Sequence, residues 1–219
     1  MKVISLIPLR GGSKGVPRKN IKLLKNKPLC YYVINSSKKC SLINETWVST
    51  DDDEIEKICK DLNVNVHRRH PSCGLDKSSS DSVIKDFIDS HNDIDVIVLM
   101  QATNPFTQEI DLTNAITKFN TNKYKLLIGV IESHTFLWKE NNGFIYRVND
   151  KIRTRQLADS EYEEDGSYYI FNKNDFIKNN YILPSEHVGY NINSNNFHVE
   201  IDEPIDFEIV QLLSKYLPD

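Results

Sequence analysis

Near its start the chain reads Val3-Ile4-Ser5-Leu6-Ile7-Pro8-Leu9 and then Arg10-Gly11-Gly12-Ser13-Lys14-Gly15-Val16-Pro17-Arg18-Lys19-Asn20. The apolar run predicts a buried strand, and the loop after it holds three glycines, one serine, one asparagine and four basic residues. Glycines let a backbone turn tightly and bring its N–H groups close to an anion. Strands that feed such loops hold nucleotide phosphates in α/β folds. The stretch therefore predicts an α/β protein whose first loop binds phosphate.

This loop differs from the two best-known phosphate loops. Lys14 is followed by Gly15 rather than by Ser or Thr, so the loop is not a Walker A motif, and it contains no G-x-G-x-x-G pattern. Pro17 prevents a helix from running straight on from Gly15. A solvated basic turn is the alternative interpretation, but four cations among glycines directly after an apolar strand favour phosphate binding.

Strand-like and helix-like segments alternate along the chain. Apolar runs typical of strands lie at residues 2–9, 45–49, 64–67, 94–100, 126–131 and 166–171. Apolar residues at helical spacing lie at residues 29–39, 52–62, 80–91, 110–119 and 205–217. This alternation predicts a Rossmann-like, mostly parallel sheet with helices on both faces. The length suits a single domain at residues 1–219.

A β-hairpin interrupts this alternation after residue 132. Two aromatic-rich segments, residues 136–139 and 144–147, flank the turn Asn141-Asn142-Gly143. The hairpin is either an arm that reaches a partner subunit or a surface hairpin that covers the core.

Composition excludes several classes of protein. The net charge of −4 argues against general nucleic-acid binding. No apolar stretch approaches the ~20 residues that cross a bilayer, and the first residues do not resemble a signal peptide. The four cysteines form no C-x-x-C pair, which is typical of reduced thiols in a cytoplasmic protein. We therefore expect a cytoplasmic protein with no membrane or nucleic-acid partner.

Polar residues follow several predicted strands, and the carboxyl ends of parallel strands meet at one edge of a sheet. Gln101 follows one strand with an amide that both donates and accepts hydrogen bonds. Three acids, Asp51 to Asp53, follow another strand, where they either contact a ligand or cap the next helix. Near the C-terminus, Glu200 and Asp202 would project from one side of a strand, since side chains repeat every two residues. Two carboxylates facing nucleotide phosphates predict a Mg²⁺ site, the alternative being a solvated acidic strand end.

The segment from Pro8 to Ile21 resembles the signature loop of the CMP-sialic acid synthetase family, the acylneuraminate cytidylyltransferases, with Leu9 in place of Ala. Further similarities follow in family order along nearly the whole chain. They lie at residues 49–51, 68–81, 101–106, 153–157, 162–170 and 199–206.

The resemblance implies a set of functional residues. In the first loop it implies CTP contacts from Leu9, Arg10, Gly12, Ser13, Lys14, Lys19 and Asn20. Cytosine and ribose would be bound by Asp76, Ser80 and one of the pair Arg68 and Arg69, of which we select Arg69. Ser80 is also a candidate cap for the following helix. Gln101 would face the sugar, and Arg155 would pair with its carboxylate.

The implied reaction is transfer of CMP from CTP to the anomeric hydroxyl of an acidic nonulosonic sugar, with release of pyrophosphate. Arg10, Lys19 and Asp202 are the predicted catalytic residues, and Glu200 and Asp202 the predicted magnesium ligands. The resemblance also implies a homodimer formed through an inserted arm at about residues 133–162.

The chain departs from the family pattern on the sugar and metal side. Glu200 and Asp165 stand where the family has Asp and Asn, and Ala102 stands where it has Pro. An acid at Asp165 would repel a sugar carboxylate if it pointed into the site. Because of these departures, the sequence does not decide which acidic nonulosonic acid is the acceptor; the candidates include sialic, legionaminic and pseudaminic acid. Two alternatives remain: a nucleotidyltransferase for another acceptor, such as a sugar phosphate or phosphonate, and a non-catalytic nucleotide-binding relative.

Overall fold

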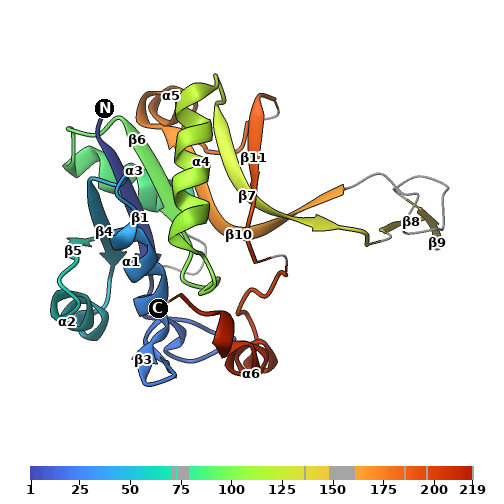
Figure 1. The fold of residues 1–219 in the computed structure, drawn as a ribbon, viewed down its shortest axis with the longest axis horizontal. Helices are drawn as coiled ribbons and strands as arrows, with labels where there is room; N and C mark the ends of the chain where they lie inside the picture. The colour runs from blue at the N-terminus through green and yellow to red at the C-terminus, as the bar shows by residue number, and fades with distance from the viewer. Residues whose placement is uncertain are drawn as a thin grey trace.

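The fold is built on one mixed β-sheet. The structure is a computed structural model that describes residues 1–70, 73, 79–135, 137–147, 161–184, 186–195 and 197–218, and within them seven strands pair in the order β11-β7-β10-β6-β1-β4-β5 (Figure 1). These strands are β1 (Val3–Leu9), β4 (Glu45–Thr50), β5 (Asn65–Arg68), β6 (Val96–Met100), β7 (Leu126–Ser133), β10 (Glu161–Asn172) and β11 (Val188–Ile192). Only β10 among them runs antiparallel to its neighbours, β6 and β7. The predicted mostly parallel sheet is confirmed.

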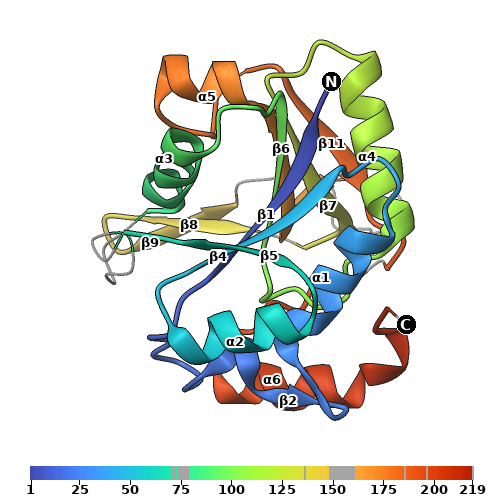
Figure 2. The ribbon, with the colours of Figure 1, turned by 90° about the vertical axis from the view of Figure 1, so that its left-hand side faces the viewer.

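Helices cover both faces of the sheet because successive residues of a strand point to opposite sides. In β1, Val3, Ile7 and Leu9 pack toward α1 (Leu29–Lys39), α2 (Asp53–Asp61) and α4 (Glu109–Thr121). Ile4 and Leu6 pack toward α3 (Ser80–Ser90) and α5 (Lys173–Asn179). Figure 2 shows α3 and α5 on one side of the sheet and α1 and α4 on the other.

A third apolar cluster joins the first loop to the C-terminal part of the chain. It contains Val16 of the loop, Ile201, and Phe207 and Val210 of α6 (Pro204–Leu212), all nearly inaccessible to solvent. Burying such side chains stabilises by roughly 1.5–3 kcal/mol each. This packing holds segments from opposite ends of the sequence side by side.

The predicted hairpin is formed by β8 (Trp138–Asn141) and β9 (Phe144–Arg147). Its turn residues Asn142 and Gly143 have φ of 52° and 80°, the left-handed values that a two-residue hairpin turn of type I′ requires. Figure 1 shows the hairpin projecting well away from the sheet, beyond the ends of β7 and β10. Residues 148–160 of the predicted arm lie outside the described residues.

Several elements were not predicted from the sequence. They are the two-residue strands β2 (Leu23–Leu24) and β3 (Lys27–Pro28), the 3₁₀ turn η1 (Lys19–Ile21), helix α5 and edge strand β11. The predicted final helix at 205–217 ends at Leu212 and is followed by a 3₁₀ turn, η4 (Ser214–Tyr216). Within the described residues, no helix is both long and apolar enough to cross a membrane.

Candidate active site

A cleft of about 300 Å³ opens beyond the carboxyl ends of β1, β5 and β6. Nine residues predicted from the sequence line it: Arg10, Ser13, Lys19, Asn20, Arg69, Ser80, Gln101, Glu200 and Asp202. These residues come from five separate stretches of the chain, and the fold brings them to one edge of the sheet, as expected for ligand sites in open α/β sheets.

The first loop is closed by a hydrogen bond between its ends, and it also contacts the segment that carries Glu200 and Asp202. The buried side chain of Asn20 donates a hydrogen bond to the Arg10 carbonyl (3.0 Å). Lys19 Nζ donates to the carbonyl of Ile201 and lies 3.3 Å from Asp202 Oδ1. Gly15 permits this approach, because a Cβ at that position would collide with the backbone carbonyl of Asp202. Cationic and acidic groups therefore face the same space.

The segment that carries the two acids predicted to bind magnesium is held by the loop that follows β6. Residues 199–202 are not a strand, contrary to the sequence-based expectation, although the backbone N–H of Ile201 donates to the Thr103 carbonyl (3.0 Å). Because Ile201 is completely buried, Glu200 and Asp202 on either side of it are left to line the cleft. Thr103 Oγ1 donates to Glu200 Oε1 (2.9 Å), and the Glu200 carboxylate rests against Gly166, where φ is +67°.

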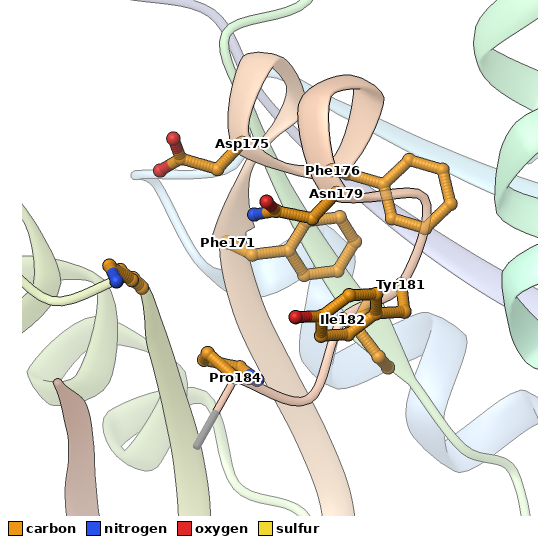
Figure 3. Close-up of a pocket in the computed structure, with 8 residues that line it drawn as sticks. Phe171, Asp175, Phe176, Asn179, Tyr181, Ile182 and Pro184 are labelled. Carbon is orange, nitrogen blue, oxygen red and sulfur yellow. The ribbon is translucent and has the colours of Figure 1, made fainter. Parts of the chain in front are cut away.

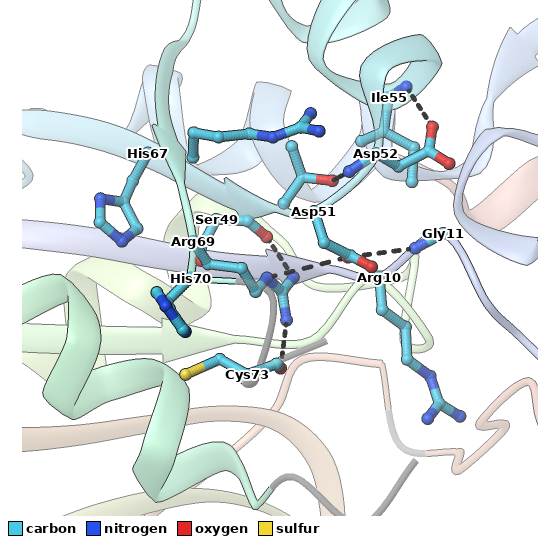
Figure 4. A network of polar contacts seen from close by, with 12 residues as sticks. Arg10, Gly11, Ser49, Asp51, Asp52, Ile55, His67, Arg69, His70 and Cys73 are labelled. Carbon is cyan, nitrogen blue, oxygen red and sulfur yellow. Dashed lines mark hydrogen bonds and ion pairs between the residues drawn. The ribbon is translucent and has the colours of Figure 1, made fainter. Parts of the chain in front are cut away.

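The structure distinguishes the adjacent arginines Arg68 and Arg69. Arg69 is 5% exposed, lines the cleft and donates to the Ser49 carbonyl (Figure 4). Burial lowers its pKa, although Asp51 Oδ1, 3.9 Å from Arg69 Nε, acts in the opposite direction. Arg68 lies elsewhere and pairs with Asp53 (2.8 Å) and Glu56 (3.2 Å) on α2. Arg69 is thus the arginine placed to meet a ligand in the cleft.

Asp51 and Asp52 take separate roles at the end of β4. Asp52 caps α2 by accepting hydrogen bonds from the backbone N–H groups of Glu54 and Ile55, both at 3.0 Å. Asp51 accepts a long hydrogen bond from the Gly11 N–H (3.4 Å) on one side and faces Arg69 on the other, as Figure 4 shows. The predicted capping role therefore belongs to Asp52, while Asp51 links the first loop to Arg69.

Other predicted residues do not line the cleft. The Leu9 side chain is completely buried in the core, so only its backbone can face a ligand. Gly12 and Lys14 lie on the exposed part of the loop and are not part of the cleft wall. Ser79, not Ser80, caps α3 by accepting from the Ser82 N–H (3.2 Å). Asp76 and Arg155 fall outside the described residues.

Gln101 reaches the cleft beside a buried tyrosine that the sequence analysis did not single out. Its Nε2 donates to the hydroxyl of Tyr169 (3.5 Å), and that hydroxyl donates to Glu164. Burial and the neighbouring Glu164 raise the pKa of Tyr169, so the phenol keeps its proton. Thr103 was also missed as a contact residue; its position just after β6 was the available signal.

Asp165 does not point into the cleft. It is 3% exposed and accepts hydrogen bonds from the Ser167 N–H (3.0 Å), the Ser167 hydroxyl and the Asn193 amide. Its backbone carbonyl accepts from Asn104 Nδ2 (3.0 Å). The repulsion of a sugar carboxylate that an inward-pointing Asp165 would cause does not arise in this arrangement.

A much smaller pocket, of about 10 Å³, lies between the end of β10 and α5. Figure 3 shows Phe171, Phe176 and Tyr181 around it. None of the predicted functional residues lines this pocket, and its walls carry fewer charged groups than the main cleft. The main cleft is therefore the candidate active site.

Comparison with known proteins assigns nearly the whole chain, including the segments that form the sheet and the cleft, to one family. The family described as "Cytidylyltransferase" matches residues 4–214. The chain is 34% identical to the N-acylneuraminate cytidylyltransferase A of Danio rerio, over 95% of this chain and 50% of that protein. It is 29% identical to the pseudaminic acid cytidylyltransferase of Campylobacter jejuni, over 98% of this chain and 97% of that one. The chain thus spans about half the length of several curated relatives it matches.

Solved structures share the fold at low sequence identity. A CMP:2-keto-3-deoxy-manno-octonic acid synthetase complexed with CTP has a TM-score of 0.76 and 15% identity, with 98% of this chain and 99% of that chain covered. A 4-diphosphocytidyl-2C-methyl-D-erythritol synthase from Anaerococcus prevotii has a TM-score of 0.71 and 10% identity, with 98% of each chain covered.

Proposed function

Since this chain belongs to the cytidylyltransferase family, we propose that it transfers CMP from CTP to the anomeric hydroxyl of an acidic nonulosonic sugar and releases pyrophosphate. The observation that carries the proposal is the contact of Lys19 with the segment of Glu200 and Asp202, which puts a basic glycine-rich loop and two carboxylates on one cleft. The names of the N-acylneuraminate and pseudaminic acid relatives support an acidic nonulosonic acceptor.

In the proposed reaction the anomeric oxygen of the sugar attacks the α-phosphorus of CTP. The bond from that phosphorus to the bridging oxygen breaks, pyrophosphate leaves with the bonding pair, and the hydroxyl proton passes to solvent. Such transfers depend on positioning and on neutralising charge. Arg10 and Lys19 would stabilise the charge on the triphosphate and on the leaving pyrophosphate.

The donor set suits Mg²⁺. Glu200 and Asp202 present carboxylate oxygens to the cleft, and Thr103 engages only one oxygen of Glu200. Among the described residues no three His, Cys, Asp or Glu side chains converge, so the two acids would share the ion with phosphate oxygens and waters, which is how Mg²⁺ is commonly held. Bound there, Mg²⁺ would neutralise phosphate charge and lower the pKa of the attacking hydroxyl.

The hairpin supports a proposed homodimer. Trp138, Phe144 and Tyr146 are 54%, 79% and 51% exposed on an arm that extends beyond the sheet (Figure 1). We expect a second copy of the chain to cover these aromatic side chains. The double variant Trp138→Asp/Phe144→Asp should then sediment as a monomer, whereas Leu212→Asp, at an equally exposed position on α6, should not change the mass. A monomeric wild-type protein would contradict the homodimer, and a dimeric double variant would contradict its formation through the hairpin.

We also propose that the protein acts in the cytoplasm. Cys30, Cys40, Cys59 and Cys73 are not joined in disulfides, which suits a reducing compartment. Their oxidation state in protein extracted under alkylating conditions tests this; disulfides in freshly extracted protein would contradict it.

The function is tested by pyrophosphate release from CTP and Mg²⁺ with a panel of acceptors. The proposal predicts release that depends on sialic, legionaminic or pseudaminic acid and on Mg²⁺. Release with sugar phosphates or phosphonates alone would assign another acceptor class. CTP binding without turnover on any acceptor would identify a non-catalytic relative.

A further inference from the structure

The guanidinium of Arg18, in the first loop, pairs with two carboxylates at the start of α2. Its Nη1 lies 2.5 Å from Asp52 Oδ2, and its Nη2 lies 3.0 Å from Asp52 Oδ1 and 2.5 Å from Glu54 Oε2. The backbone of Arg18 adopts a left-handed conformation, with φ of 55° and ψ of 29°, immediately before η1. Non-glycine residues seldom adopt that conformation, so surrounding contacts must hold it.

Asp52 meets the first loop at two places. Its carboxylate accepts hydrogen bonds from both terminal guanidinium nitrogens of Arg18. The same carboxylate lies so close to Gly11 that a Cβ on residue 11 would collide with it. The loop therefore rests on Asp52 near its beginning and again near its end. Asp52 is in turn fixed by capping α2, with hydrogen bonds from Glu54 and Ile55. Asp52 thus joins the loop to a rigid helix.

The pairing of Arg18 leaves it poorly suited to bind phosphate. Two carboxylates already neutralise its charge, and it is absent from the cleft wall, where Arg10 and Lys19 are present. The bidentate bond also raises the pKa of Arg18 and lowers that of Asp52, so both groups stay charged at neutral pH. Arg18 thus contacts the start of α2 and leaves the cleft to other basic residues.

We propose that Arg18 is a positioning residue: with Asp52 it latches the phosphate-binding loop onto the N-terminus of α2, so that Lys19 and Asn20 meet the triphosphate already ordered. The latch rests on the proposed function, because it acts on CTP. Without it the loop would have to be ordered by CTP itself, at a cost in affinity.

Asp52→Asn separates the latch from direct phosphate binding by Arg18. Asn caps helices about as well as Asp, so α2 keeps its cap while the bidentate ion pair is lost. If Arg18 is a latch, Asp52→Asn weakens CTP binding. If Arg18 binds phosphate directly, Asp52→Asn frees its charge and leaves CTP binding unchanged or tighter.

The test is calorimetric titration of CTP, with Mg²⁺, into the wild-type protein and five variants. We expect Arg18→Ala to weaken CTP binding about tenfold and Asp52→Asn to weaken it severalfold. The double variant Arg18→Ala/Asp52→Asn should bind CTP as Arg18→Ala does, because the two single changes remove the same interaction. Arg18→Lys, which keeps the charge but not the bidentate geometry, should give an intermediate affinity. Arg68→Ala is the matched control, since Arg68 pairs with α2 through Asp53 and Glu56 without touching the loop. It should bind CTP as the wild-type protein does.

A kinetic readout separates positioning from general destabilisation. In Arg18→Ala the KM for CTP should rise by the same factor as the dissociation constant, while the KM for the acceptor stays unchanged. Additive effects in the double variant would overturn the latch. Unchanged or tighter CTP binding in Asp52→Asn would overturn it even if Arg18→Ala failed to fold. A wild-type protein that bound no CTP would overturn the proposed function and the latch together, whereas wild-type binding with unaffected variants would overturn the latch alone.

Discussion

Lys19 Nζ lies 3.3 Å from Asp202 Oδ1, although 183 positions separate the two residues in the chain. The side chain of Lys19 is 13% exposed and also donates to the carbonyl of Ile201. A cation in the first loop and an acid near the C-terminus are thus in contact at the wall of the cleft. A triphosphate and a divalent ion would bind beside this pair, in the cleft that both residues line.

Replacing either partner should stop turnover without unfolding the protein. Lys19→Ala and Asp202→Ala are each expected to lower kcat by at least about 10²-fold, because each removes a charge that would face the triphosphate in the proposed reaction. Circular dichroism should remain that of the wild type. Lys85→Ala, which removes a surface pair with Asp89 on α3, serves as the control and should retain full kcat. Wild-type rates in Lys19→Ala or Asp202→Ala would refute the assigned roles.

Gly15→Ala should separate the first loop from the acidic segment. Its Cβ would collide with the backbone carbonyl of Asp202, which cannot yield as a flexible side chain would. We expect a lower melting temperature and a loss of at least about tenfold in kcat/KM, since small displacements of catalytic groups are costly. Gly12→Ala, in the same loop, meets no atom within 4 Å and should keep the wild-type melting temperature. Normal kcat/KM in Gly15→Ala would show that the close approach is unimportant.

Tyr168→Phe should destabilise the buried polar network behind the cleft. The Tyr168 hydroxyl donates to Asn193 Oδ1 (2.6 Å) and accepts from Asn191 Nδ2 (2.9 Å), and all three residues are buried. Losing the hydroxyl leaves buried amide groups short of a partner, which should lower the free energy of unfolding by about 1–3 kcal/mol in urea titrations. Tyr146→Phe, on the exposed hairpin, should leave it unchanged. Equal stabilities would indicate that the network contributes little.

Low pH should lower the free energy of unfolding, partly through protonation of Asp52. The bidentate bond from Arg18 lowers the pKa of Asp52 from 3.8 to about 2. Because that pKa is lower in the folded than in the unfolded state, the contribution is complete above about pH 4 and is lost as the pH falls toward about 2. It should be on the order of 1 kcal/mol, since the Arg18 side chain is 39% exposed to screening solvent. Urea unfolding of Asp52→Asn should show a flatter acid limb than the wild type; parallel curves from pH 5 to about pH 2 would contradict this.

Much of the fold follows from local pattern. The run from Val3 to Leu9 is apolar on both faces, which is what a central strand covered by helices on both sides requires. Helix α1 begins and ends at the predicted residues, Leu29 and Lys39, because Pro28 precedes a strongly apolar stripe. Once the strands are parallel, their carboxyl ends must share an edge, so the meeting of Arg10 and Gln101 follows from topology.

Strand β11 shows why other elements could not be predicted. Its exposed positions are the apolar Val188, Tyr190 and Ile192, while its buried positions are Gly189 and Asn191. The hydrophobic pattern therefore indicates the wrong face, and burial of Asn191 depends on the hydroxyl of Tyr168, a partner distant in sequence. Helix α5 has seven residues and one buried side chain, Phe176, which is too little periodicity to detect.

The choice between Arg68 and Arg69 needed tertiary structure. Two adjacent residues of one type differ only in the direction in which they point, and that direction is set by the pairing of Thr50 on β4 with Arg68 on β5. The sequence indicated that an arginine contacts the ligand, but it did not indicate which of the two arginines faces the cleft. The environment of Asp165 was hidden in the same way, because its partner Asn193 lies 28 positions further along the chain.

The most direct test of the central claim is a crystal structure of the protein with CTP and Mg²⁺. The account predicts the triphosphate between the loop at residues 10–20 and the carboxylates of Glu200 and Asp202, with Lys19 at the phosphates and Arg69 toward the nucleoside. A triphosphate bound at any other surface, or bound in the cleft with its phosphates remote from Lys19 and Asp202, would contradict it.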